Sequence, residues 1–162
     1  MLDQALPEHV SGQEQRYNQI AGIWTLLLEQ FTLFCEGVGA PRCLPTLRAR
    51  YLCLKPTGQL IVIAVVALAL RTRELSLTQV VERLNQIPWD IDQPHWQNIA
   101  VVDGRINGTV ATIALASYLV AYLIGLPLSD TEVQKLEVDY RKAKRQETAA
   151  LPQPLFPKSS KE

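Results

Sequence analysis

The first clear pattern in the chain is a line of apolar residues spaced three and four positions apart, which begins at Tyr17. Its members are Tyr17, Ile20, Trp24, Leu27, Phe31 and Phe34. Polar residues from Thr25 to Glu36 recur on another face, so the spacing predicts an amphipathic helix that ends at Gly37 or Gly39 and packs its aromatic stripe into a core. The polar residues 1–16 predict a flexible lead-in.

Two uncharged apolar runs predict buried helices. Residues 60–70 are rich in Ile and Val at first and in Ala and Leu at the end, and this length and composition favour a helix over a strand. Residues 109–126 form the second run, which ends at a glycine and a proline. Before the first run, residues 37–58 are interrupted by several Gly and Pro, which leaves room for one short element at 47–54.

Two further helices are indicated by capping boxes, in which a serine and a Gln or Glu three residues later cap each other's backbone N–H groups. Ser76 with Gln79 predicts a short helix, and Ser129 with Glu132 predicts another. Beyond the second of these helices, residues 147–162 are rich in Pro, Ala, Ser and Lys and predict a disordered tail.

A segment rich in Pro and Trp, Ile87 to Asn107, lies between the predicted helices. Pro88 and Pro94 keep its first part out of regular structure. Residues 99–102, which precede an Asp-Gly pair, are typical of a short strand entering a turn. We therefore expect an irregular loop followed by a small strand pair.

The fold class that these elements predict is mainly α. We expect one small helical domain over residues 17–146, with about five helices, a Pro/Trp-rich connecting loop and one short strand pair. No charged start with an apolar run and a cleavage site lies near Met1, which predicts a cytoplasmic protein. The alternative is a small single-span membrane protein anchored by residues 109–126, because eighteen uncharged residues just reach the length of a transmembrane helix.

The charges of the chain balance overall but are unevenly distributed. Residues 1–36 carry five acids and one base, whereas residues 37–73 carry six bases and no acid. A local basic zone attracts phosphate even in a neutral protein. We therefore predict contacts with DNA from four of these residues, Arg42, Arg48, Arg50 and Lys55. The alternative is that these cations are solvated ends of apolar elements.

The sequence does not supply a complete active site or metal site. His95 lies near Asp90 and Asp92, but a hydrolytic or metal site needs a nucleophile or further ligands, and the chain has only two histidines. Its three cysteines match no metal-binding spacing and predict reduced thiols. We predict no catalytic residues, no metal, no cofactor and a protein that is not an enzyme.

Three other features suggest chemistry only weakly. Trp89 and Trp96 are candidates for stacking on nucleic-acid bases, although anchoring a loop onto a core is the favoured interpretation. Gly58 follows Lys55 and precedes a helix, but the GxxxxGK[ST] spacing of a phosphate loop is absent. The cation Arg105 follows an Asp-Gly turn, and such a turn alone does not indicate a site.

Three short pieces, taken in order, resemble the C-terminal part of proteins that carry a DGQHR motif, the group that includes the DNA sulfur modification protein DndB. They are Lys55-Pro56-Thr57-Gly58-Gln59, then Leu84-Asn85-Gln86-Ile87-Pro88-Trp89-Asp90 with Pro94-His95-Trp96-Gln97, and Gly104-Arg105-Ile106 before a helix that ends in Tyr122-Leu123-Ile124-Gly125-Leu126. Together they cover about residues 47–145. The motif residues are Gly58, Gln59, Trp89, Asp90, Trp96, Gly104 and Arg105.

The Asp-Gly-Gln-His-Arg string that names the family does not occur in the chain, which resembles the distal portion alone. In the family this string belongs to a preceding ParB-like domain, so no catalytic residue is carried over. The resemblance implies a non-catalytic accessory or truncated DndB-like protein, associated with DNA phosphorothioate modification or its regulation. It also implies DNA, an upstream DGQHR-bearing subunit or other DNA-modification proteins as partners.

Overall fold

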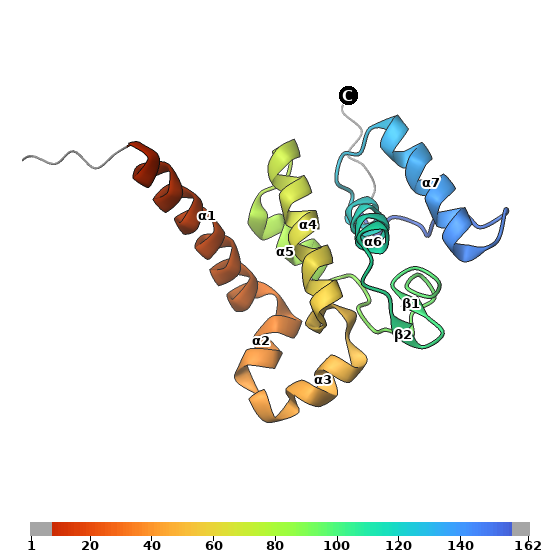
Figure 1. Ribbon diagram of the computed structural model, residues 1–162, viewed down its shortest axis with the longest axis horizontal. Coiled ribbons are helices and arrows are strands. Elements are labelled where there is room, and N and C mark those ends of the chain that lie inside the picture. The colour runs from red at the N-terminus through yellow and green to blue at the C-terminus, as the bar shows by residue number, and fades with distance from the viewer. Residues whose placement is uncertain (1–7, 157–162) are drawn as a thin grey trace, which may run out of the picture.

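The computed structural model describes residues 8–156 and confirms a mainly helical fold with one short antiparallel strand pair (Figure 1). Within these residues there are seven α-helices and two 3-10 helices. The elements run in the order α1 (Glu8–Gln30), α2 (Thr32–Gly39), η1 (Pro41–Cys43), α3 (Leu44–Arg50), η2 (Leu52–Leu54), α4 (Pro56–Thr72), α5 (Leu77–Leu84), β1 (Val101–Val102), β2 (Arg105–Ile106), α6 (Val110–Leu123) and α7 (Asp130–Lys144).

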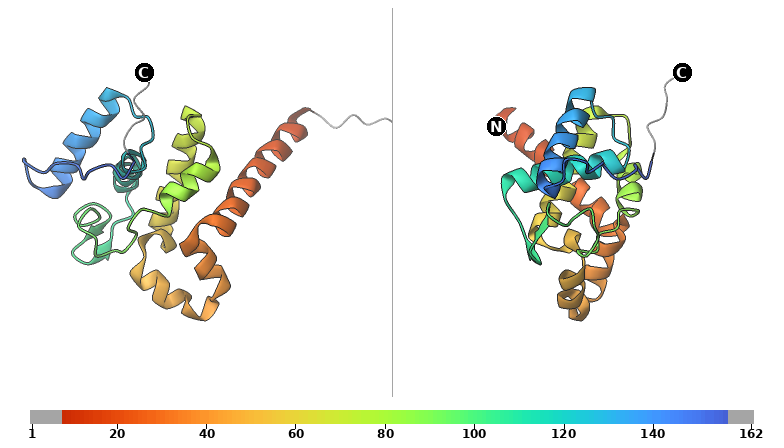
Figure 2. Two further views of the ribbon diagram at one scale, coloured as in Figure 1. Left: turned by 180° about the vertical axis from the view of Figure 1, so that it is seen from behind. Right: turned by 90° about the vertical axis from the view of Figure 1, so that its right-hand side faces the viewer.

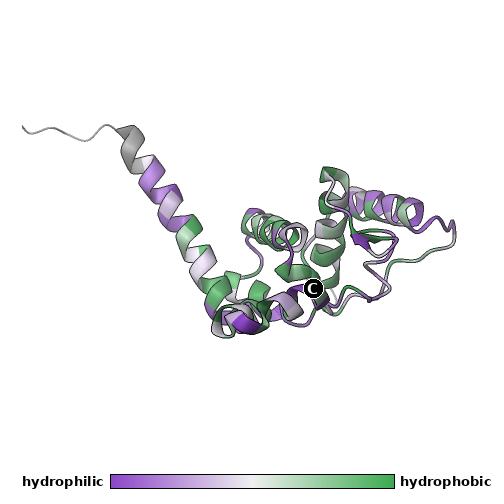
Figure 3. Cartoon of the chain, turned by 60° about the horizontal axis from the view of Figure 1, so that its bottom comes forward, coloured by the Kyte–Doolittle hydropathy of each residue, from purple (hydrophilic) through white to green (hydrophobic). Residues whose placement is uncertain are grey.

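The core is built around α4, which packs against α5, α6 and η2. The two apolar runs predicted to be buried helices form α4 and α6, and each buries one side: Ile61, Val62 and Val65 of α4 and Leu119 and Val120 of α6 are fully buried. Helix α7 packs on the far side of α6. Figure 3 shows the contrast between these helices, because α6 is hydrophobic along its length whereas α7 carries many hydrophilic residues.

The first predicted helix is interrupted and starts earlier than expected. Helix α1 begins at Glu8, so residues 8–16 continue the helix where a flexible lead-in was expected, and residues 1–7 lie outside the described residues. Phe31 then adopts an extended conformation and α2 restarts at Thr32. The side chain of Asn85 bridges this break, since its amide donates to the carbonyl of Gln30 at 2.9 Å and its oxygen accepts from the N–H of Thr32 at 2.9 Å. A distant residue therefore caps both helix ends, which local periodicity does not reveal.

Both predicted capping boxes are present. The hydroxyl of Ser76 accepts from the N–H of Gln79 at the start of α5, and the hydroxyl of Ser129 accepts from the N–H of Glu132 at the start of α7. Helix α6 ends at Leu123, a little before the predicted limit, and Gly125 follows with a positive φ of 71°. Among residues 8–156, none of the helices combines the length and the apolar content needed to cross a membrane.

The strand pair is a two-residue hairpin. Val102 pairs with Arg105, and the turn between them has positive φ angles at both Asp103 (49°) and Gly104 (72°). Two successive positive φ angles are typical of a type I′ turn, which the Asp-Gly sequence favours. The first strand is shorter than predicted, because residues 98–100 form turns, in which the N–H of Ile99 donates to the carbonyl of Trp96 at 3.1 Å and the N–H of Asn98 donates to the carbonyl of Val101 at 2.7 Å.

The described part of the predicted disordered tail returns onto the domain. The N–H of Leu155 donates to the carbonyl of Leu123 at 2.9 Å, and the guanidinium of Arg83 lies over the ring of Phe156 at 4.7 Å. Arg83 also donates to the carbonyl of Ile124 at 2.7 Å, so one side chain joins α5, the end of α6 and the tail. The end of the described segment, Leu155 and Phe156, therefore contacts the domain, and residues 157–162 lie outside the described residues. Figure 2 shows this segment running from the end of α7 back toward α6.

Candidate functional site

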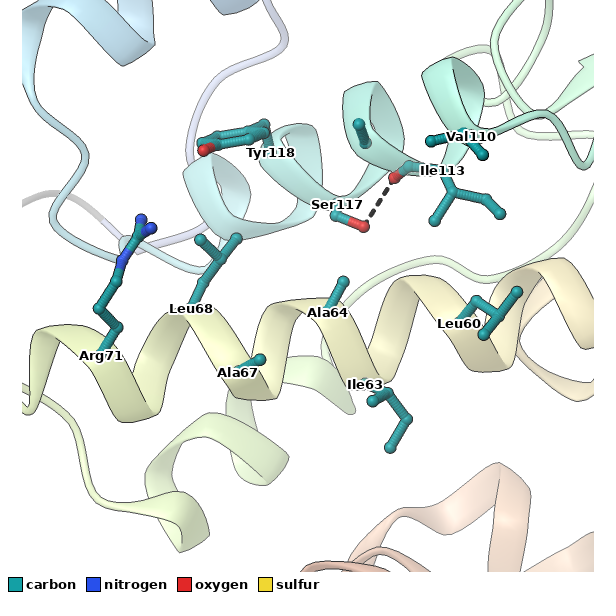
Figure 4. A pocket seen from close by; sticks show the side chains of 11 residues that line it. Leu60, Ile63, Ala64, Ala67, Leu68, Arg71, Val110, Ile113, Ser117 and Tyr118 are labelled. Atoms are coloured by element: carbon teal, nitrogen blue, oxygen red, sulfur yellow. Dashed lines mark hydrogen bonds between the residues drawn. The ribbon is translucent and has the colours of Figure 1, made fainter.

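An open apolar groove lies between α4 and α6 (Figure 4). It has a volume of about 730 Å³. Two stripes line it, one on each helix, and the members of each follow the i, i+3, i+4, i+7 pattern of a single helix face. They are Leu60, Ile63, Ala64, Ala67, Leu68 and Arg71 on α4 and Val110, Ile113, Ala114, Ser117 and Tyr118 on α6. Three of these residues are alanines, whose small side chains leave space in the groove that larger side chains would fill.

The groove is apolar apart from one end. Ser117 donates its hydroxyl to the carbonyl of Ile113 in the same helix at 2.7 Å, so this polar group is satisfied and turned inward. At the far end, the carboxylate of Glu132 accepts from the guanidinium of Arg71 at 3.3 Å and from the hydroxyl of Tyr118 at 3.4 Å. This end therefore joins α4, α6 and α7, and the rest of the groove offers only apolar contacts.

Glu132 is held in its charged form. Hydrogen bonds from the backbone and the hydroxyl of Ser129 lower the pKa of Glu132 below its ordinary value, with a further contribution from the nearby Arg71. The same carboxyl group therefore completes the capping box of α7 and anchors Arg71 at the end of the groove.

The predicted DNA-binding residues occupy one end of the molecule. Arg42 lies in η1, Arg48 and Arg50 in α3, and Lys55 at the N-cap of α4. The three arginines are exposed and Lys55 is half-buried. Because Arg48 and Arg50 are only two residues apart on a helix, their side chains lie about 200° apart around its axis and do not share a face. Figure 1 shows η1 and α3 at the end of the molecule opposite α7.

Arg50 differs from the other two arginines because it is paired. Its guanidinium donates to both carboxylate oxygens of Asp90, at 2.8 and 3.2 Å, and lies 5.0 Å from the ring centroid of Tyr51. The hydrogen bond to Asp90 raises the pKa of Arg50 above its ordinary value. In the described part of the chain, Arg42 and Arg48 take part in no ion pair.

A short backbone ladder supports this pair. The N–H of Leu52 donates to the carbonyl of Trp89 at 2.8 Å, and the N–H of Ile91 donates to the carbonyl of Arg50 at 2.9 Å. Residues 50–52 and 89–91 thus lie side by side although they are far apart in sequence. The ladder fixes the Pro/Trp-rich loop against the basic end of the domain.

Trp89 and Trp96 anchor this loop and do not face solvent. Both are buried, and their rings stack on each other with centroids 5.4 Å apart. The indole N–H of Trp89 donates to the carbonyl of Leu84, and that of Trp96 donates to the carbonyl of Pro88. With their faces covered and their donors used, the two residues are not available to stack on bases, and the loop-anchoring interpretation is confirmed.

Asp90, Asp92 and His95 do not form a common site. Asp90 forms an ion pair with Arg50, whereas the ring of His95 packs against the ring of Trp96 with centroids 4.3 Å apart. Burial lowers the pKa of His95 to about 4. Among residues 8–156 no group of three His, Cys, Asp or Glu residues could hold a metal ion. The prediction that the protein is not an enzyme stays a prediction.

Two motif residues have structural roles. A Cβ atom added at Gly58 would lie 1.9 Å from the carbonyl oxygen of Leu52, so only glycine lets α4 approach η2 this closely. Gly104 supplies the hairpin turn, and Arg105 beside it is exposed. Gln59 follows within the first turn of α4, where its N–H donates to the carbonyl of Lys55. Neither glycine forms a phosphate loop.

The three cysteines are free thiols in different environments. Cys53 is buried, and burial raises the pKa of its thiol far above the ordinary value. Cys35 is half-buried and donates to the carbonyl of Leu28 at 3.1 Å, whereas Cys43 is exposed. The expectation of reduced, unpaired thiols agrees with this arrangement within the described residues.

No protein-family model, no curated protein and no solved structure matches this chain. The resemblance to the DGQHR and DndB group therefore gains no support from the comparisons and stays a prediction. The apolar groove was missed by the sequence analysis, since the runs that form it predicted helices without indicating an uncovered side. The recurring small residues Ala64, Ala67 and Ala114 were the available signal.

Proposed function

We propose that this chain is a non-enzymatic binding module that contacts duplex DNA through η1 and α3, as an accessory to a DNA-modification system. The observation that carries the proposal is the exposure of Arg42 and Arg48, without an ion pair in the described residues, in a stretch that contains no acid from residue 37 to residue 73. Unpaired arginines on short helical elements are suited to phosphate oxygens, which accept several N–H donors from one guanidinium.

The contact that we propose is to the DNA backbone and not to the bases. The two loop tryptophans, Trp89 and Trp96, are buried, and α3, which carries Arg48, has only seven residues. Contacts to phosphate position a protein on DNA but carry no sequence information. We therefore expect weak binding that depends strongly on salt and little on sequence.

The test is a salt titration of duplex DNA binding, measured by fluorescence anisotropy with the full chain. Replacing Arg42 and Arg48 by Glu should abolish the binding or reduce the slope of log K against log salt by about two, since each lost phosphate contact contributes about 0.9. The matched control replaces Lys135 and Lys142 on α7, which are also exposed, by Glu and changes the net charge equally.

Equal weakening by the two double variants would mean that only net charge matters and would reject a site at η1 and α3. Absence of salt-dependent binding by the wild-type chain would reject the DNA contact altogether. The accessory role further predicts direct binding to a purified DGQHR-bearing protein, which a titration with that protein measures independently of DNA.

The single-span membrane alternative is weakened, because α6 has only fourteen residues, about 21 Å at 1.5 Å per residue, against a hydrocarbon layer of about 30 Å.

A further inference from the structure

Helix α1 leaves an apolar stripe without cover. All residues from 12 to 20 are exposed, and partly exposed apolar side chains continue further along the helix, where Trp24 also stacks on Phe34 with ring centroids 6.4 Å apart. Their exposed fractions are 72% for Tyr17, 56% for Ile20, 36% for Trp24 and 43% for Leu28. The spacing of three, four and four residues places them on one face. Figures 1 and 2 both show α1 leaving the body of the domain, with only its C-terminal end in contact.

Such a helix needs a partner surface. Two or three helical turns without tertiary contacts are marginal in water, because packing of the apolar face supplies most of the stability of a helix in a protein. Among the described residues, α1 packs through its C-terminal part, against α2 and α5. The groove between α4 and α6 is the complementary feature, since it is an apolar surface that lacks a helix.

The lengths of the two features agree. The stripe from Tyr17 to Leu28 and the α4 side of the groove from Leu60 to Arg71 each span eleven residue steps, about 16 Å of helix. The stripe presents large side chains, whereas the middle of the groove presents alanines. Large residues on one helix opposite small residues on the other two let three helices pack closely.

The charges also agree. Residues 1–36 are acidic overall, and Glu14 lies one helical turn before Tyr17 on the same face of α1. Arg71 stands at the C-terminal end of the groove with its guanidinium exposed, and its single ion pair with Glu132 leaves further N–H donors. An α1 helix that runs antiparallel to α4 in the groove would place Glu14 beside Arg71.

We propose that two copies of this chain form a dimer by helix exchange, in which α1 of each copy occupies the α4–α6 groove of the other. A second copy is the occupant that these observations favour, because both halves of the contact are present in one chain. A two-fold arrangement then covers both stripes and both grooves, so the assembly is closed at two copies. The dimer does not depend on DNA binding, so the two proposals succeed or fail separately.

The test is light scattering coupled to size-exclusion chromatography, with the full chain, without DNA and over a range of concentrations. The wild-type protein should have twice the chain mass of 18.1 kDa. Ile20→Glu on the stripe and Ala67→Glu in the groove should each give the monomer mass, because a carboxylate in either surface opposes burial. Val138→Glu is the matched control, since Val138 is 59% exposed on α7 and should leave the dimer unchanged.

Mixing the two monomeric variants distinguishes helix exchange from other modes of association. An Ala67→Glu copy retains its stripe and an Ile20→Glu copy retains its groove, so a one-to-one mixture should recover dimers through one intact contact. Circular dichroism checks that both variants keep their helices, and Tyr17→Glu provides a second stripe variant.

Three results would overturn the proposal. A wild-type protein that is monomeric at every concentration would show that α1 needs no second copy. An Ala67→Glu protein that remains dimeric would indicate contact between the two α1 helices instead. A mixture that stays monomeric would show that the stripe and the groove do not bind each other.

Discussion

Arg50 and Asp90 are forty residues apart in the sequence and meet in a two-pronged ion pair, with Nε 2.8 Å from Oδ1 and Nη2 3.2 Å from Oδ2. The pair lies where the backbone ladder joins α3 to the Pro/Trp-rich loop. It places a carboxylate beside the cations that we propose to contact DNA. A phosphate that binds there must therefore compete with Asp90 for Arg50.

Asp90→Asn should strengthen DNA binding if η1 and α3 form the contact. The change frees the guanidinium of Arg50 for one more phosphate, so the slope of log K against log salt should steepen by about one. The backbone hydrogen bonds of the ladder remain and keep the loop in place. Anisotropy titrations of the two proteins over a range of salt concentrations measure this.

Asp92→Asn is the control for that measurement, because Asp92 is exposed nearby and takes part in no ion pair among the described residues. It changes the net charge by the same amount. An equal effect of the two substitutions would show that general charge, and not the release of Arg50, accounts for the change.

Gly58→Ala should destabilise the domain strongly. The added Cβ would meet three backbone positions of η2, at 1.9 Å from Leu52 O, 2.5 Å from Leu52 C and 2.7 Å from Cys53 Cα. Backbone atoms cannot move aside as the end of a flexible side chain can, so we expect a loss of about 3 kcal/mol or more in the free energy of unfolding. Urea denaturation followed by circular dichroism measures it.

Gly22→Ala serves as the comparison, since nothing lies within 4 Å of the added Cβ atom in α1. This substitution should leave stability unchanged or raise it by up to about 1 kcal/mol, because alanine favours a helix interior. Similar behaviour of the two variants would contradict the close approach of α4 to η2.

His95 should make the stability of the domain depend on pH between about 6.5 and 4. Burial lowers the pKa of His95 in the folded state to about 4, partly opposed by the carbonyl of Pro88 and assisted by Lys144, whereas the unfolded chain binds the proton near pH 6.5. Because the unfolded state gains the proton first, stability is full above pH 6.5 and falls as the pH drops toward 4. His95 is partly exposed, so we expect a loss of about 1–2 kcal/mol.

His95→Phe should remove this part of the pH dependence, since the phenyl ring fills the same place beside Trp96 and does not titrate. Denaturation at pH 7 and pH 4.5 for both proteins gives the difference. Carboxylates that titrate in the same range affect both proteins equally and cancel. The interpretation fails if the variant loses as much stability on acidification as the wild type.

The fold could be predicted where the signal is local. The capping boxes at Ser76 and Ser129, the Asp-Gly hairpin turn and the two apolar helices all depend on residues a few positions apart, and the structure contains each of them. The break at Phe31 depends on Asn85, which lies more than fifty residues away, so no local pattern reports it. The contact of Phe156 with the domain likewise depends on the distant Arg83.

In the candidate sites, too, local features could be predicted from the sequence, whereas contacts between distant residues could not. Exposure of Arg42 and Arg48 could be expected from their place in a polar, Pro-rich stretch, but the pairing of Arg50 with Asp90 required the fold. Periodicity predicted an apolar face on the first helix and assigned all of it to the core. Only the three-dimensional arrangement distinguishes Leu27, which is fully buried, from Tyr17, which projects from the body of the domain.

The ladder between residues 50–52 and 89–91 also bears on how the chain reaches its folded state during synthesis. Helices α4 and α5 lie inside the loop that the ladder closes and rest on contacts between near neighbours, so they can form early. Trp89, which packs against Phe31, leaves the ribosome only after both helices have been made. We expect a nascent chain that ends before Trp89 to expose the apolar surface around Phe31 and Leu52 to chaperones, and to lose that exposure once the loop closes.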